Sequence, residues 1–198
     1  MTDSPRRQTA GVKQRPGKRE RLVAAATQLL HQRGIERTTL ADVADLAEVP
    51  PGNVYYYFKT KDDVVAAVVA GHAEQVSSTL AAIDSRFPSP KGRLKALVQE
   101  LAGQSEIVAR YGCPLGSLCS ELDKRLDAPD FATADLMLLI IDWAEAQFQE
   151  LGRGTQSRGL AVDLLAAYEG SALLANTLRD PKVLSDASGR LDAWIDAQ

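Results

Sequence analysis

Three consecutive tyrosines, Tyr55 to Tyr57, are followed by two lysines, Lys59 and Lys61. If these phenol groups were buried, each hydroxyl would need a hydrogen-bond partner, so such a run is unusual for a buried helix. On a surface, phenols can donate to phosphate oxygens and stack against sugars or thymine methyl groups, while ammonium groups neutralise phosphates. The chemistry that this segment offers is therefore contact with a nucleic-acid duplex.

The residues around the tyrosines are expected to form two short helices joined by a tight turn. Thr39 is a good N-cap for the first helix, and Pro50-Pro51 ends that helix and can begin the next. The expected inner face is apolar and comprises Leu40, Val43, Ala44, Val49, Val54 and Phe58. The expected outer face of the second helix comprises Gly52, Asn53, Tyr55 and Tyr56. A narrow and mostly polar face of this kind suits a helix that enters the major groove of DNA.

Helical periodicity continues over most of the chain, and no trustworthy strand pattern interrupts it. A helix that begins at Lys18 precedes the pair, and Gly34 is the usual residue past a helix end. Further helices are expected over 61–85, 91–107, 114–127, 129–150, 157–179 and 181–197. The predicted fold is all-α with about nine helices. It comprises a three-helix head with the helix-turn-helix at residues 18–63, a larger helical body at 64–198, and a flexible basic arm at 1–17.

Basic and acidic side chains are unevenly distributed between these parts. Residues 1–63 carry 11 basic and 8 acidic side chains, whereas residues 64–198 carry 12 basic and 18 acidic ones. The basic excess of the head indicates a polyanionic partner. A solvated basic tail would account for the same charges equally well.

Composition and missing motifs exclude several classes of protein. The chain has 198 residues, of which 45% are hydrophobic and 25% charged, as in an ordinary globular protein. No apolar run reaches the roughly 20 residues of a membrane span, and no secretory signal is recognisable, so a cytoplasmic location is expected. Neither His31 nor His72 has a partner at metal-ligand spacing, and no cofactor motif is present. The phosphate-binding glycine loop and the HExxH, CxxC and GxSxG motifs are missing, so an enzyme is not expected.

The segment from Thr38 to Lys61 resembles the signature of the tetracycline-repressor (TetR) family. The matching residues are Thr38-Thr39-Leu40-Ala41-Asp42-Val43-Ala44, Val49 and Gly52-Asn53-Val54-Tyr55-Tyr56-Tyr57-Phe58-Lys59-Thr60-Lys61. The resemblance implies a DNA-binding head and a helical body that binds a small effector and forms a homodimer. It also implies that Thr39 caps its helix and touches phosphate. The residues that it places nearest the bases are Pro51, Gly52, Asn53 and Tyr55, and those that it places on the DNA backbone are Tyr56, Lys59 and Lys61.

Three positions depart from many relatives. Glu48 stands where a glycine is common, and Pro50 stands where a small polar residue is common. The turn is therefore expected to differ in backbone shape, and Glu48 brings a negative charge near the DNA. Ala41 occupies a position that is often basic, so no base hydrogen bond is expected there. Direct readout must then rely on Asn53, the tyrosines and DNA shape.

In the body, the resemblance assigns dimerisation to the last two helices. The candidate interface residues are Leu160, Leu164, Leu165, Tyr168, Ala172, Leu173, Val183, Leu191, Trp194 and Ile195. The effector pocket is expected among residues 91–150. Its candidate wall residues are Tyr111, Cys113, Leu115, Leu118, Met137, Ile141, Trp143 and Phe148. For both sets the alternative is ordinary packing inside one chain.

Cys113 precedes Pro114, which can begin a helix. Backbone N–H groups and the helix dipole at that position would lower the pKa of the thiol and favour a reactive thiolate. The segment is similar to a Gly-Cys-x-Leu-Gly turn in some TetR members, a few of which respond to electrophiles. The alternatives are a plain ligand contact or a small buried core residue, and Cys119 is expected to be core.

The sequence therefore predicts a dimeric, ligand-responsive transcriptional regulator that binds double-stranded operator DNA. The favoured form is a repressor that a small, largely apolar or electrophilic effector releases from its operator. The alternative is a helical small-molecule-binding protein without specific DNA activity.

Overall fold

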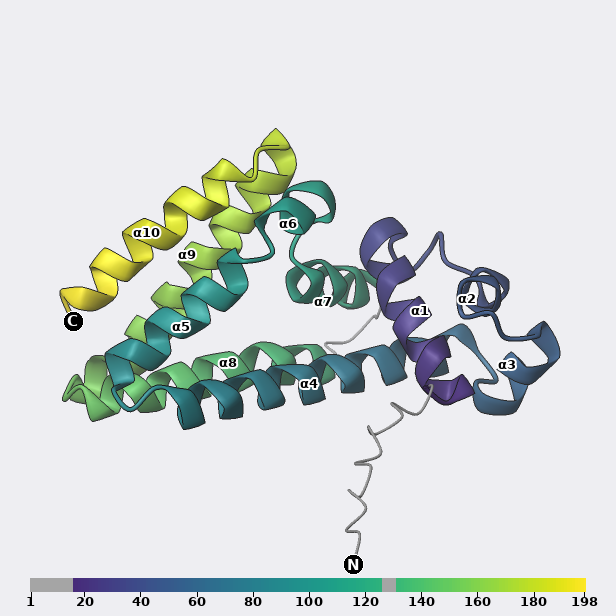
Figure 1. The fold of residues 1–198 in the computed structure, drawn as a ribbon, viewed down its shortest axis with the longest axis horizontal. Coiled ribbons are helices and arrows are strands. Elements are labelled where there is room, and N and C mark those ends of the chain that lie inside the picture. Colours follow the sequence, from purple (N-terminus) through teal and green to yellow (C-terminus); the bar gives the residue numbers. More distant parts are fainter. Residues whose placement is uncertain (1–15, 126–130) are drawn as a thin grey trace, which may run out of the picture.

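The computed structural model describes residues 16–125 and 131–198, and its regular structure in those ranges is entirely helical (Figure 1). The α-helices are α1 (Lys18–Arg33), α2 (Leu40–Leu46), α3 (Pro51–Tyr57), α4 (Lys61–Arg86), α5 (Pro90–Ala102), α6 (Ser105–Tyr111), α7 (Pro114–Arg125), α8 (Phe131–Glu150), α9 (Ser157–Leu178) and α10 (Lys182–Asp196). A short 3-10 helix, η1 (Gly154–Gln156), precedes α9. The all-α prediction is confirmed. The arm predicted at 1–17 lies almost wholly outside the described residues.

The helix predicted over 91–107 is divided into α5 and α6. α5 ends at Ala102, with Gly103 as its C-cap, and α6 begins at Ser105. Glycine is a weak helix former because its backbone loses the most freedom on folding. α6 in turn ends at Gly112, whose φ of +89° lies in the left-handed region that favours glycine. The chain then continues into α7, which packs against α1.

Side-chain caps explain why α2 and α4 begin where the sequence predicts. Thr39 Oγ1 accepts the backbone N–H of Asp42 (3.1 Å), and the Asp42 carboxylate accepts the backbone N–H of Thr39 (2.9 Å). Thr60 and Asp63 repeat this arrangement at the start of α4, at 3.1 and 2.9 Å. These capping boxes satisfy backbone N–H groups that have no partner within the first helical turn.

The head packs α1, α2 and α3 around one apolar cluster. The predicted inner face is confirmed: its buried members are Val43, Ala44, Val49, Val54 and Phe58, and Leu40 is partly buried against them. The same cluster also contains Val64, Val65 and Val68 from α4, and Leu118 and Leu122 from α7. The head is therefore built partly on α4 and α7, and the boundary expected after residue 63 falls inside the first turn of α4.

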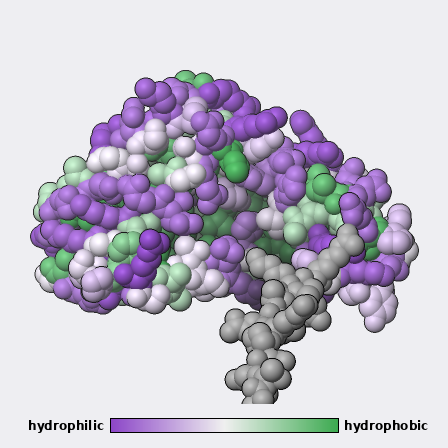
Figure 2. All heavy atoms as spheres, viewed as in Figure 1, coloured by the Kyte–Doolittle hydropathy of each residue, from purple (hydrophilic) through white to green (hydrophobic). Residues whose placement is uncertain are grey.

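α4 leaves the head and runs along the body beside α8 (Figure 1). α9 packs against α8, α6 and α10, and α5 packs against α10, α8 and α4. The face drawn in Figure 2 is mainly hydrophilic, with small hydrophobic patches, several of them in the hollow between head and body. No helix of the described ranges is long and apolar enough to cross a membrane.

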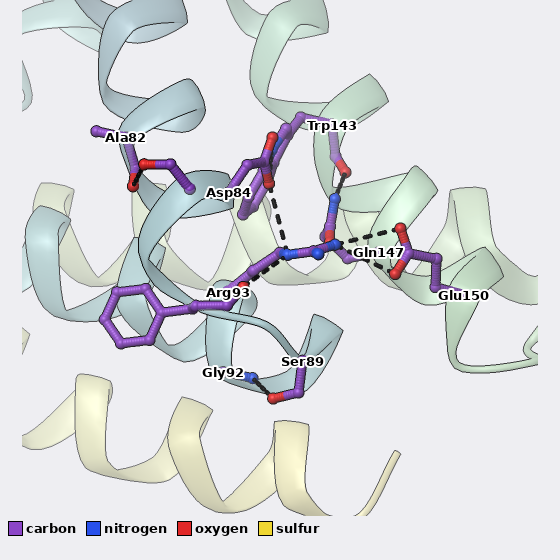
Figure 3. Close-up of polar contacts among 10 residues, drawn as sticks. Ala82, Asp84, Ser89, Gly92, Arg93, Trp143, Gln147 and Glu150 are labelled. Atoms are coloured by element: carbon purple, nitrogen blue, oxygen red, sulfur yellow. Dashed lines mark hydrogen bonds and ion pairs between the residues drawn. The ribbon is translucent and has the colours of Figure 1, made fainter.

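One polar cluster joins three helices of the body around Arg93 of α5 (Figure 3). Its guanidinium donates to Oε1 of Gln147 (3.0 Å) and pairs with Glu150 (3.2 Å), both on α8. It also lies 3.8 Å from the carboxylate of Asp84 on α4. Asp84 in turn accepts the indole N–H of Trp143 from α8 (3.1 Å). Arg93 thereby ties the end of α4 to α5 and α8.

Replacing Arg93 by alanine is expected to lower the free energy of unfolding by about 2–3 kcal/mol, because buried Gln147 loses its charged donor. Arg158→Ala is the matched control, since Arg158 pairs with Asp142 and Glu145 but is 43% exposed. Exposed ion pairs contribute at most about 1 kcal/mol. Urea unfolding followed by circular dichroism measures both losses, and equal losses would contradict the special role of Arg93.

Candidate nucleic-acid interface and ligand cavity

α2 and α3 form the predicted helix-turn-helix at the outer side of the head (Figure 1). The exposed residues of α3 are Pro51, Gly52, Tyr55 and Tyr56, and its half-buried residues are Asn53 and Tyr57. Only Val54 of this helix is buried. Tyr55 and Tyr56 expose 56% and 78% of their surface, which makes them the most prominent aromatic side chains of the head. The outer face is therefore the one that the sequence predicts, whereas Tyr57 packs against the head core.

The turn between α2 and α3 places Glu48 in a backbone conformation that glycine favours, and the expected difference in turn shape from relatives stays a prediction. Glu48 has a φ of +51°, in the left-handed region that favours glycine. Arg21 of α1 supports this turn, because its Nη1 donates to the carbonyl oxygens of Ala47 (2.8 Å) and Glu48 (3.3 Å). Sequence reasoning missed Arg21, since no local pattern reveals a contact across 26 residues.

The two lysines that were expected on phosphate are engaged with backbone carbonyls. Lys59 Nζ donates to the carbonyl oxygen of Tyr55 (2.6 Å), within the same turn. Lys61 is half-buried, and its Nζ donates to the carbonyl oxygen of Ile35 (3.0 Å) in the loop after α1. Lys61 thus braces the loop that leads into α2, while Lys59 lies on the exposed side of the turn.

Thr39 is exposed and caps α2, as the resemblance implies. Its hydroxyl also donates to the Asp42 carboxylate (2.7 Å). Hydrogen bonds from Thr39 hold the pKa of Asp42 below its usual value. Backbone N–H groups of Thr60 and Lys59 do the same for the pKa of Asp63. The backbone N–H groups of Lys59 and Thr60 before α4 are therefore already bound by the carboxylate of Asp63.

A separate cavity of about 210 Å³, open at one side, lies in the body. Its apolar lining comprises Val76, Leu80, Leu97, Leu101, Leu115 and Ile140. Its other lining residues are His72, Gln75, Thr79, Glu100, Gln104, Cys113, Pro114 and Tyr168. α4 and α5 supply most of this wall, and the start of α7 closes one end. A cavity with a largely apolar lining and a few polar groups is typical of a small-molecule site.

Of the eight wall residues expected from the sequence, Cys113 and Leu115 line this cavity. Leu118 belongs instead to the head core, and Phe148 is fully buried against Trp194, with ring centroids 5.8 Å apart. Trp143 binds Asp84 in the Arg93 cluster. The remaining three, Tyr111, Met137 and Ile141, are not among its lining residues: Tyr111 packs on His31, and the other two pack on body clusters.

Six of the eight expected wall residues lie outside this cavity for a physical reason. Bulky apolar residues between 91 and 150 mark cores and cavities alike, so residue type alone does not separate them. The cavity is bounded mainly by facing sides of α4 and α5, and α4 lies outside the predicted range. His72, which has no partner at metal-ligand spacing in the sequence, is one of the residues found there.

Cys113 occupies the cap position that Pro114 predicts, but the expected lowering of its pKa is wrong. Its Sγ accepts the backbone N–H of Gly116 (3.4 Å), and its thiol donates to Oε1 of Glu169 (3.1 Å). Burial, followed by the nearby Glu169 carboxylate, raises the pKa of Cys113 to about 12. The thiol is therefore protonated at neutral pH, and a reactive thiolate is not favoured. Cys119 is buried, as expected.

Most of the residues expected at a dimer interface are buried within the chain itself. The buried ones are Leu164, Leu165, Tyr168, Ala172, Leu191 and Ile195, and the half-buried ones are Leu160, Val183 and Trp194. Leu173 is the one expected residue that is largely exposed, at 66%. The large exposed side chains that the sequence analysis missed on α9 are Val162, Leu174 and Leu178. The reason is that α9 has apolar residues on both faces, and periodicity alone does not tell which face meets α8 and α10.

α7 connects the cavity with the head. Its first turn carries Leu115, which lines the cavity. Farther along, Oε2 of Glu121 accepts the backbone N–H of Ile35 (2.6 Å), directly after α1. Near its end, Arg125 pairs with Glu36 (3.0 Å) and with Asp62 at the start of α4 (3.3 Å). One helix therefore touches the cavity, the loop before α2 and the start of α4.

Comparisons with known proteins agree on one family. The sequence profile described as bacterial regulatory proteins, tetR family, matches residues 22–68. The chain is 31% identical over 163 residues to the HTH-type transcriptional repressor DhaR from Mycobacterium sp. (strain GP1), covering 76% of this chain and 75% of that protein. It is 29% identical over 172 residues to an uncharacterized HTH-type transcriptional regulator in the lacX 3' region of Lactococcus lactis, covering 84% and 87%. The crystal structure of a TetR transcriptional regulator from Legionella pneumophila superposes with a TM-score of 0.79 at 21% identity, covering 91% and 98%.

The head is expected to lose stability in acid through its two capping carboxylates. Because the folded-state pKa values of Asp42 and Asp63 are lowered, their contribution is present above the unfolded pKa, about 4, and is lost as pH falls through the folded values. Asp63→Asn is therefore expected to lower the melting temperature at pH 7. That difference from the native protein should shrink steadily below pH 4. Asp45→Asn, on the exposed side of α2, is the control; a difference for Asp63→Asn that stays constant with pH would contradict this assignment.

Proposed function

This chain belongs to the tetR family of bacterial regulatory proteins, and we propose that it acts as a homodimeric repressor released from operator DNA by a small-molecule effector. It is a helix-turn-helix transcriptional regulator and not an enzyme. Relatives of this chain include a protein named as a transcriptional repressor. Residues 18–63 would serve as the DNA-binding domain and 64–198 as the effector-binding and dimerisation domain.

The exposed face of α3 supports the DNA-binding role. Pro51 and Gly52 leave the start of the helix free of large side chains, so its backbone can approach base edges closely. Tyr55 and Tyr56 then project beyond them. We assign Pro51, Gly52, Asn53 and Tyr55 to the bases, and Thr39, Tyr56 and Lys59 to the phosphates. Lys61 is assigned a bracing role, because its ammonium group already holds the Ile35 carbonyl.

The exposed face of α9 supports a dimer. Apart from Asp163, its exposed residues are apolar or small: Gly159, Val162, Ala166, Ala167, Gly170, Leu173, Leu174, Thr177 and Leu178. Soluble monomers rarely expose an apolar patch of this extent. The exposed side of α10 adds the small residues Ser185, Gly189 and Ala193, which allow helices to approach closely. Two copies paired through α9 and α10 would form a four-helix bundle and present two recognition helices to two half-sites.

α7 supplies a physical route from effector to DNA. A ligand that displaces Leu115 would shift a helix whose Glu121 and Arg125 hold the loop after α1 and the start of α4. That loop leads into α2, so a shift of α7 would change the orientation of α3. The effector would then favour the arrangement in which the two recognition helices no longer match the operator, which is a coupling free energy between two sites.

The DNA-binding role is tested with fragments from the chain's own upstream region. The native protein is expected to bind one fragment preferentially, with an affinity that falls steeply as salt rises, because phosphate contacts release counterions. Tyr55→Ala should weaken binding to that fragment by about tenfold, since it removes a contact to the duplex. Fluorescence anisotropy across a salt series measures both effects.

Ile107→Ala is the matched control, because Ile107 is 52% exposed on α6 in the body. It should bind DNA as the native protein does. If Tyr55→Ala and Tyr56→Ala both retain native affinity and fragment preference, the proposed interface is wrong. The chain would then be better described as a binding protein whose head does not read DNA through α3.

Dimerisation is tested by placing a charge on the exposed face of α9. Leu173→Glu is expected to convert the dimer into monomers at micromolar concentration, because two carboxylates would be buried without partners. The variant should stay folded, since Leu173 belongs to no core cluster of its own chain. Sedimentation equilibrium measures the state, with Ile107→Glu as the control. A native protein that is monomeric, or a Leu173→Glu variant that stays dimeric, would contradict the proposed face.

A further inference from the structure

The charges around the body cavity are of one sign. Among the described residues that line it, none is lysine or arginine, and Glu100 of α5 is the only carboxylate. A second carboxylate, Glu169, lies directly behind the wall, where it accepts the thiol of Cys113 (3.1 Å). The cavity therefore offers no cationic side chain of its own to an anionic ligand, and it places negative charge at two points.

The remaining titratable side chains of the wall, His72 and Tyr168, do not change this balance. Burial raises the pKa of Tyr168, so its phenol stays uncharged. Burial lowers the pKa of His72, and the positive charge that His31 can carry lowers it further. The imidazole of His72 is therefore neutral at physiological pH. Gln75, Gln104 and Thr79 add dipoles that can accept hydrogen bonds but carry no charge.

The charged form of Glu169 is poorly solvated, and a nearby cation would stabilise it. It is half-buried, and burial raises its pKa because the charged carboxylate is poorly solvated there. A positive charge within the cavity would interact favourably with it through the Cys113 wall. A negative charge would instead add a like-charge repulsion to the cost of burial.

We propose that the effector of this regulator is an amphipathic organic cation, whose apolar body fills the leucine-rich wall and whose positive group lies toward Glu100. This inference rests on the proposed function, because it takes the cavity to be the effector site. The apolar wall supplies most of the affinity, and the carboxylates select the sign of the charge. A neutral molecule of the same shape binds more weakly, and an anion binds most weakly.

The neighbouring groove does not offer an equally good site for an anion. This groove shares Thr79 and Glu100 with the cavity and carries the cations Arg86 and Lys95. Lys95 is already paired with Asp196, at 2.5 Å, and the guanidinium of Arg86 lies over the ring of Phe87, 5.4 Å from its centroid. Neither cation is among the residues that line the cavity, where Glu100, an exposed residue, supplies the only carboxylate of the described wall.

The test uses three probes with one skeleton: 4-(1-naphthyl)butylammonium, 4-(1-naphthyl)butanol and 4-(1-naphthyl)butanoate. Isothermal titration calorimetry on the full chain at low salt is expected to show the ammonium binding about fivefold more tightly than the alcohol, the gain typical of an ion pair near a surface. The butanoate should bind more weakly than the alcohol. The preference for the ammonium should shrink as salt screens the carboxylates.

Glutamate-to-glutamine variants show which carboxylate causes the preference for the ammonium probe. Glu100→Gln should bind the alcohol as the native protein does but lose most of the preference for the ammonium. Glu169→Gln should lose a smaller part of it, because Glu169 stands behind the wall. Glu106→Gln is the matched control, an exposed carboxylate on α6 that does not line the cavity, and it should keep the full preference.

The proposal is overturned if the ammonium has no advantage over the alcohol, if the butanoate binds best, or if none of the probes binds. It is also overturned if the preference survives in the Glu100→Gln, Glu169→Gln double variant. DNA binding of the ligand-free protein is measured separately by anisotropy. A failure of the cation preference with intact DNA binding therefore rejects this inference alone, whereas lost DNA binding with an intact preference rejects the repressor role alone.

Discussion

The recognition surface depends on the way α3 is anchored to the head core. This helix has seven residues and inserts one fully buried side chain, Val54, with Phe58 buried directly after it. Because successive residues of a helix are about 100° apart, burying Val54 turns positions 55 and 56 outward, and the extended backbone at Phe58 returns the chain to the core. The tyrosine hydroxyls thus need no partner inside the protein. The same assignment of residues to the inner and outer faces of α3 thus gives both the core packing and the exposed tyrosines. A shift of one residue along the helix would lose both.

The head is not an independent unit in this structure. α4 and α7 contribute apolar side chains to the head core, and Glu121, Arg125 and Lys61 hold the loop before α2 through polar contacts. Because α4 and α7 are packed into the head core, a displacement of either helix in the body would also move the head. A close-packed interior deforms little, so its helices shift as rigid elements. This packing provides the structural connection that the proposed effector response requires. It also explains why residue 63 does not mark a clear domain boundary: the first turns of α4 belong to the head core.

Cys113 illustrates how two physical effects compete at one atom. Its place before Pro114 exposes the thiol to backbone N–H groups, which favour the thiolate. Burial and the Glu169 carboxylate act in the opposite direction and prevail. The first effect is local and can be read from adjacent residues. The second depends on Glu169, which is 56 residues away in sequence. The same remote carboxylate that, together with burial, raises the pKa of the thiol also adds to the negative charge that Glu100 places at the cavity.

The sequence by itself determined the helical fold, the start of most helices, the inner and outer faces of α3, and the family. These features depend on neighbouring residues: caps, prolines, glycines and the helical period, all of which act within one or two turns. Only the tertiary structure decided which apolar residues line the cavity, which face of α9 is exposed, and where the ammonium groups of Lys59 and Lys61 go. Those outcomes depend on which helices pack together and at what distance. Apolar side chains such as Leu115 and Phe148 are alike in sequence, and packing alone places one in a cavity wall and the other in a sealed core.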